Sequence, residues 1–122
     1  GSGVLVKDTT KVSWGVNIPG IFHASFWYIP AQVTTCVIWK ATGANASLLV
    51  GYDSVAGAFF LEDMLFNRIV VPYMISANDR VCIGVCQTAS ERRLFVAKMG
   101  TDMQSAVGAY PPASGYSALK LY

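Results

Sequence analysis

The chain has 122 residues, of which 53% are apolar and 13% are charged, against about 45–50% and about 25% in ordinary soluble domains. At this length we expect one domain over residues 1–122, because two would each lack the residues for a core. The net charge is +2, and the Lys and Arg residues are scattered apart from Arg92 and Arg93, so no basic stripe favours a nucleic acid partner.

Taken in chain order, short apolar runs rich in β-branched and aromatic residues alternate with turn-forming residues. Helix is nearly absent, because its best candidate, 61–66, is short. Residues 100–116 hold Gly, Ala, Ser and Pro without a period, so we expect a long loop there. The rhythm predicts an all-β, two-sheet antiparallel sandwich. The expected strands are 11–16, 24–29, 34–40, 47–53, 58–61, 68–71, 80–87, 93–98 and 118–122.

The start of the chain says little about targeting. Residues 1–3 resemble what an expression tag leaves behind, so the native start is hidden. Residues 12–39 carry no formal charge but contain Pro, Gly and polar groups at a density that disfavours a membrane span. The last strand most simply pairs with the first, and the three tryptophans are expected to lie mostly in the core.

No residues for catalysis are visible in the sequence. The three cysteines cannot all pair and lack a zinc-ligand spacing, so we expect buried thiols. His23 is the only histidine and has no well-placed nucleophile beside it. The adjacent Glu62 and Asp63 are expected in a solvated loop and not side by side in a cleft. We therefore expect a binding or structural protein and not an enzyme.

Three parts of the chain resemble a laminin G-like, concanavalin A-like jelly roll. They are the stretch Phe22 to Pro30 (FHASFWYIP), the runs 36–43 (CVIWKATG) and 48–53 (LLVGYD), and the pair 77–85 and 93–96. Arg80 stands where the family has Trp, and Lys98-Met99-Gly100 replaces its Asn-Gly turn. The resemblance implies a jelly-roll sandwich that binds a glycan. In some members it also implies calcium at a sheet rim, for which Asp53 is the candidate ligand by position; its alternative role is to end a strand at a turn.

The candidate ligand-binding residues are chosen for aromatic or hydrogen-bonding groups in turns and loops. Tyr110 and Tyr116 could stack on a sugar ring, or fold back as a lid over the sandwich. Tyr52 and Asn45 could bond hydroxyls or simply cap turns. Arg93 could hold an acidic sugar or lie in a solvated turn, as we also expect of Arg92.

Two functions remain open. The first is a non-catalytic glycan-binding or adhesion module of a larger surface, secreted or viral protein, with a glycan or cell-surface polysaccharide as partner. The alternative is a structural or assembly domain of a phage tail, fibre or other virion component that forms a homo-oligomer. Both place the protein outside the cell or on a virion in preference to the cytoplasm.

Overall fold

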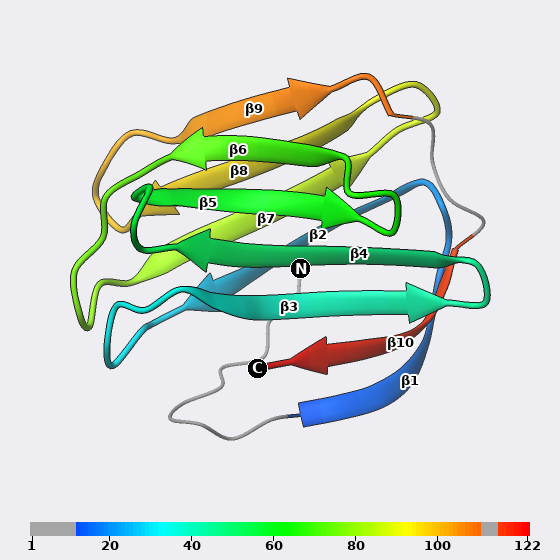
Figure 1. Cartoon of the computed structure of the whole chain (residues 1–122), viewed down its shortest axis with the longest axis horizontal. Coiled ribbons are helices and arrows are strands. Elements are labelled where there is room, and N and C mark those ends of the chain that lie inside the picture. Colours follow the sequence, from blue (N-terminus) through cyan, green and yellow to red (C-terminus); the bar gives the residue numbers. More distant parts are fainter. Residues whose placement is uncertain (1–11, 111–114) are drawn as a thin grey trace.

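The computed structural model describes residues 12–110 and 115–122, with side chains from Ile18 onward. In these residues it contains ten strands in two antiparallel sheets that lie face to face (Figure 1). The predicted two-sheet β-sandwich is thereby confirmed. The strands are β1 Val12–Ile18, β2 Phe22–Tyr28, β3 Cys36–Gly43, β4 Ala46–Asp53, β5 Ala58–Asp63, β6 Arg68–Pro72, β7 Val81–Gln87, β8 Arg92–Lys98, β9 Gln104–Gly108 and β10 Tyr116–Leu121.

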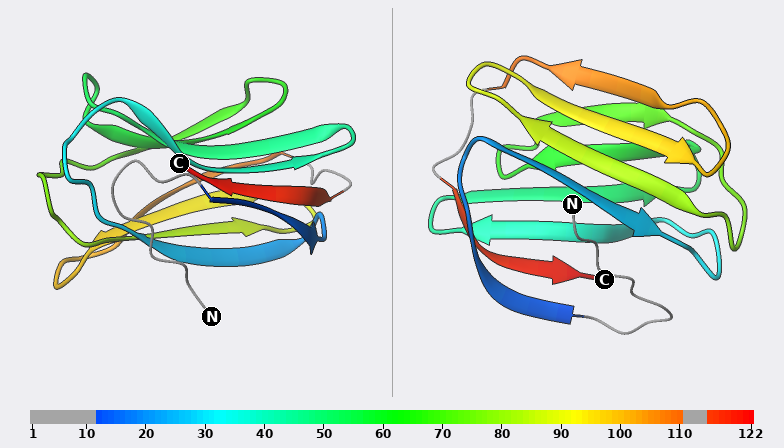
Figure 2. Two further views of the ribbon diagram at one scale, coloured as in Figure 1. Left: turned by 90° about the horizontal axis from the view of Figure 1, so that it is seen from below. Right: turned by 180° about the vertical axis from the view of Figure 1, so that it is seen from behind.

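One sheet has six strands in the order β1-β10-β3-β4-β5-β6, and the other has four in the order β2-β7-β8-β9. The edge-on view separates the two layers, and the view from behind brings the four-stranded sheet to the front (Figure 2). The last strand pairs with the first, as expected, with Val12 opposite Leu121. The chain passes from one sheet to the other between β1 and β2, where Pro19 and Gly20 separate the two strands.

The structure corrects the prediction for residues 100–116. They were expected to form a loop throughout, but β9 lies within them and pairs with β8, with Ala106 opposite Leu94. This strand is short and mostly exposed, and its sequence QSAVG holds one large apolar residue. An edge strand that is half exposed buries few side chains, so the alternation of apolar and polar residues that marks a strand is weak in this sequence.

The core lies between the two sheets and is built from the inward-facing residues of both, which alternate with outward-facing residues along each strand. In β7 the inward positions are fully buried, among them Val81, Ile83 and Val85. Phe26 and Trp39 face each other across the core with ring centroids 6.0 Å apart. The expectation that Trp39 is buried is confirmed, whereas Trp27 is 46% exposed and points away from the core; the side chain of Trp14 lies outside the described residues.

Candidate functional site

The outward face of the four-stranded sheet presents aligned rows of side chains that are neutral except for Arg93. Paired residues of neighbouring antiparallel strands lie on the same face of a sheet. The strand pairings therefore set three parallel rows across this face, two residues apart along each strand. The rows are Val107, Arg93, Cys86 and His23; then Ser105, Phe95, Gly84 and Ser25; then Ala97, Cys82 and Trp27.

A shallow depression of about 250 Å³ lies on this face, around the middle row. Its centre is Gly84, which has no side chain, between Ser25 on one neighbouring strand and Phe95 on the other. A Cβ atom at Gly84 would lie 3.5 Å from the nearest atoms of Phe95, which is an ordinary van der Waals contact. The ring therefore stands beside the glycine and leaves the space above it open. The lining consists of His23, Ser25, Cys82, Gly84, Phe95, Val96, Ala97 and Met103.

Two larger side chains, Trp27 and Arg93, belong to the two rows that flank the middle row of this depression. Trp27 is in the row of Cys82 and Ala97, which both line it. Arg93 is next to Phe95 on the outward face, and its guanidinium carbon lies 5.9 Å from the centre of that ring. By strand spacing, the backbone positions of Arg93 and Trp27 are about 17 Å apart. An extended molecule could therefore contact an aromatic ring at one end and a cation at the other.

The structure does not bring the other sequence-predicted binding residues to this face. Tyr52 is 1% exposed and Tyr116 is 3% exposed, so both rings belong to the core. Tyr52 packs edge-on against Phe59 with ring centroids 4.7 Å apart. Tyr116 packs edge-on against Phe22 at 5.8 Å. Neither ring presents a face for stacking in this structure.

The remaining candidates lie apart from one another. Tyr110 is half-buried against the core, with the guanidinium of Arg92 over its ring at 5.7 Å, which matches the lid alternative. Asn45 is exposed in the turn between β3 and β4. Asp53 accepts hydrogen bonds from the amides of Val55 and Ala56 at 3.0 and 3.1 Å, so its carboxylate caps the turn after β4. Within the described residues, no group of three His, Cys, Asp or Glu side chains gathers to hold a metal.

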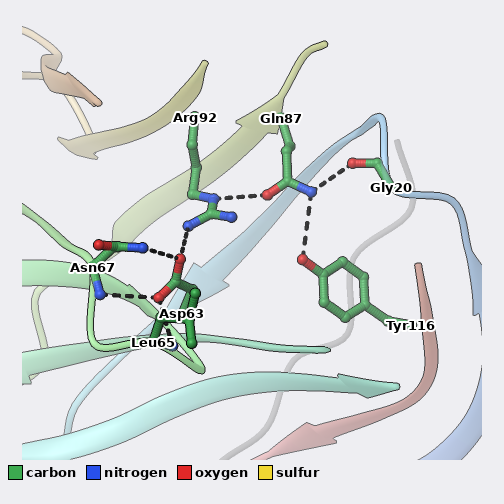
Figure 3. Close-up of polar contacts among 7 residues, drawn as sticks. All are labelled: Gly20, Asp63, Leu65, Asn67, Gln87, Arg92 and Tyr116. Atoms are coloured by element: carbon green, nitrogen blue, oxygen red, sulfur yellow. Dashed lines mark hydrogen bonds and ion pairs between the residues drawn. The ribbon is translucent and has the colours of Figure 1, made fainter. Parts of the chain in front are cut away.

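A buried polar network connects the sheets, and sequence reasoning missed it (Figure 3). Arg92 was expected in a solvated turn but is 2% exposed. It donates to Asp63 Oδ2 at 3.0 Å and to Gln87 Oε1 at 2.7 Å. Gln87 in turn donates to the carbonyl of Gly20 and, at 3.4 Å, to the hydroxyl of Tyr116. The expectation of a solvated loop for Asp63 was also wrong, because it ends β5 and faces this guanidinium.

The carboxylate of Asp63 is held in its charged form. Partial burial acts to raise its pKa, but hydrogen bonds from Asn67 and Arg92 outweigh that effect and lower the pKa below its ordinary value. Elsewhere in the core, burial raises the pKa of Tyr28, and its hydrogen bond to Cys36 raises it further. Both groups therefore keep one protonation state near neutral pH and act as structural groups.

The turn after β5 displays an exposed apolar tip, defined here as Met64, Leu65 and Phe66. Leu65 is 78% exposed and Phe66 is 81% exposed. Phe66 has φ 64°, a left-handed conformation that is unfavourable for a bulky residue. Asp63 holds the tip in place, since its Oδ1 atom accepts from the amides of Leu65 and Asn67, each at 2.9 Å.

Comparisons with known proteins do not name a relative for this chain. No family model matches it, and no curated protein matches it. In the described part of the chain, there is also no helix with the length and hydrophobicity that crossing a bilayer requires.

Proposed function

We propose that this protein is a non-catalytic glycan-binding or adhesion module that binds an extended saccharide across the outward face of its four-stranded sheet. The observation that carries the proposal is the open depression at Gly84, with Phe95 beside it and the exposed Trp27 paired with Cys82 of its lining. Sugars offer apolar C–H faces that pack on aromatic rings, while their hydroxyls bond to nearby polar groups. Ser25 and His23 supply such groups in the same depression.

The composition of this face supports a largely uncharged ligand surface. Of the strand residues in the three rows, Arg93 alone carries a formal charge. A neutral, shallow surface suits a ligand that is itself hydrated and mostly neutral, such as an oligosaccharide. It offers no carboxylate pair for glycan hydrolysis, which requires an acid and a second carboxylate across the bond. The proposed activity is therefore binding without turnover.

A glycan array, followed by titration of the best saccharide, tests the proposal. We expect Trp27→Ala to weaken binding about fivefold, because losing a ring contact costs roughly 1 kcal/mol. Val70→Ala is the matched control, since Val70 is 44% exposed on the opposite outer face, close to the 46% of Trp27. Equal affinity for the wild type and Trp27→Ala would remove the site from this face. Failure to bind any saccharide would refute the function.

The alternative, a self-associating structural domain of a virion or fibre, draws on one observation: the exposed apolar tip. A bulky group displayed in a defined but unfavourable backbone conformation is typical of contact sites. Sedimentation of the purified protein separates the two functions. A stable trimer that dissociates in the double variant Leu65→Ser, Phe66→Ser would favour the alternative over glycan binding.

A further inference from the structure

Resting on the proposed function, we infer that the saccharide bound by this face carries a carboxylate, and that Arg93 holds that carboxylate. Arg93 lies near the start of β8, an inner strand of the sheet, with Cys86 of β7 on one side and Val107 of β9 on the other. Arg93 is the one cation among the residues of the three rows, and it therefore favours a ligand that places a negative charge beside it.

The guanidinium is only weakly engaged within the protein. Among the described residues its ionic partner is Glu91, at 3.7 Å, which is beyond the range of an ordinary hydrogen bond. The two side chains are 36% and 45% exposed, and ion pairs between groups this exposed contribute little. A ligand carboxylate can therefore replace Glu91 at small cost.

The position of the guanidinium is nevertheless defined. It stands beside the ring of Phe95, within the distance at which a cation is attracted to an aromatic face. Phe95 lines the depression, so a sugar ring placed over Gly84 would bring a substituent on its edge toward Arg93. The planar guanidinium donates two parallel hydrogen bonds to a carboxylate, which a lysine at this position could not reproduce.

The charge count favours a carboxylated sugar over a sulfated or phosphorylated one. Polyanions that carry several sulfates or phosphates need several cations. The rows on this face offer one cation, Arg93. In the same row, His23 lies two strands from Arg93, beyond Cys86, and its imidazole can bond another part of an extended ligand. One guanidinium, whose exposed partner Glu91 a ligand can replace, fits a saccharide with one acidic group per contact, such as a sialylated or uronic acid oligosaccharide.

The test compares acidic saccharides with their own uncharged counterparts. Sialyllactose is paired with lactose, and trigalacturonate with its methyl ester, and each is titrated into the wild type, Arg93→Gln, Arg93→Lys and Arg68→Gln. Arg68 is the matched control, because it lies on the opposite outer face, bonds Glu62 at 2.9 Å and stands 4.0 Å over Phe60. We expect the wild type to prefer one acidic saccharide by roughly tenfold, the usual value of a hydrogen-bonded charge.

Arg93→Gln should remove that preference, Arg93→Lys should restore only part of it, and Arg68→Gln should keep it in full. Loss of the preference in both glutamine variants, or in neither, would overturn the inference. Stronger Arg93-dependent binding of a heparin fragment than of either acid would overturn the assignment of a carboxylate. Binding to neutral saccharides alone would overturn the inference and leave the proposed function standing, whereas no binding to any saccharide would remove both.

Discussion

On the outer face of each sheet a glycine pairs with a phenylalanine, but the phenylalanine ring covers the glycine in only one of them. In the six-stranded sheet Gly51 pairs with Phe60, and in the four-stranded sheet Gly84 pairs with Phe95. The ring of Phe60 occupies the place of a Cβ atom on Gly51 and is itself 8% exposed. Phe95 stands beside Gly84 and leaves it open. A glycine paired with a phenylalanine thus makes room for the ring in one sheet and forms the base of a depression in the other.

The two outer faces also differ in the number of charged residues that they carry. On the six-stranded sheet one row across the strands runs through Lys120, Lys40, Leu49, Glu62 and Arg68. Four of these five side chains are charged, and Arg68 and Glu62 form an ion pair at 2.9 Å. In the three rows of the four-stranded sheet, Arg93 is the only charged residue. The six-stranded face therefore carries the charges of an ordinary solvated surface, whereas the rows of the four-stranded face are largely uncharged.

The two outer faces keep their relation only while the two sheets stay packed together. The ion pair between Asp63 of one sheet and Arg92 of the other contributes to that packing, and removing it should have the largest effect. We expect Asp63→Asn to lower the free energy of unfolding by about 3 kcal/mol, because it leaves the buried Arg92 without its counter-charge. Asp53→Asn is the matched control, since Asp53 also ends a strand and caps a turn. Its loss should stay below about 1 kcal/mol. Urea unfolding measures both, and equal losses would contradict the role given to the ion pair.

The same carboxylate sets a dependence on pH. The pKa of Asp63 is lower in the folded protein than its ordinary value of about 3.9. The stability it contributes is therefore fully present above that ordinary value and is lost as the pH falls through the lower folded value. Melting temperatures measured from neutral to acid pH should drop less steeply in Asp63→Asn than in the wild type. Parallel curves would mean that other groups control acid unfolding.

Gly51→Ala tests the covered glycine and should have the next largest effect. A Cβ atom there would overlap the ring of Phe60 and lie 2.7 Å from the carbonyl oxygen of Cys36. Since the backbone cannot move aside cheaply, we expect a loss of about 2 kcal/mol from overpacking. Chemical unfolding gives the value, and a change below about 0.5 kcal/mol would show that Phe60 can leave its place.

Gly84→Ala tests the open glycine, and of these substitutions it should change stability least. Its Cβ would make only ordinary contacts with Phe95. We expect the variant to be as stable as the wild type or more stable, by up to about 1 kcal/mol, because alanine narrows the unfolded ensemble. Gly84→Leu, with a longer side chain over the depression, should retain the fold and lose saccharide binding. Destabilisation of Gly84→Ala as large as that of Gly51→Ala would remove the distinction between the two faces.

Much of the fold could be predicted because it rests on local pattern. In β7 the alternation of Val81, Ile83 and Val85 with smaller residues marks both the strand and its buried face. The same pattern placed small residues at Cys82, Gly84 and Cys86, which was the one available signal for the depression. The rows across strands could not be predicted, because they depend on the register between segments that are far apart in sequence.

The candidate binding residues were chosen from sequence because they were expected in or beside turns and loops. Only some of them, such as Asn45, are exposed in the structure. Tyr116 looks like a loop residue beside Gly115, but it begins β10 and lies in the core. Arg92 and Arg93 are adjacent and chemically identical, yet strand alternation buries the first and exposes the second. That outcome follows from where β8 begins, one residue earlier than the pattern indicated.

The polar network around Arg92 has a consequence for the order of folding. Arg92 and Asp63 are 29 residues apart, and Gln87 and Gly20 are 67 apart. These groups lose water only when β5, β8 and the start of β2 have come together, so each would be buried without a partner if it closed early. We therefore expect the network to form after the rate-limiting step of folding. It should then lower the rate of unfolding and leave the rate of folding nearly unchanged.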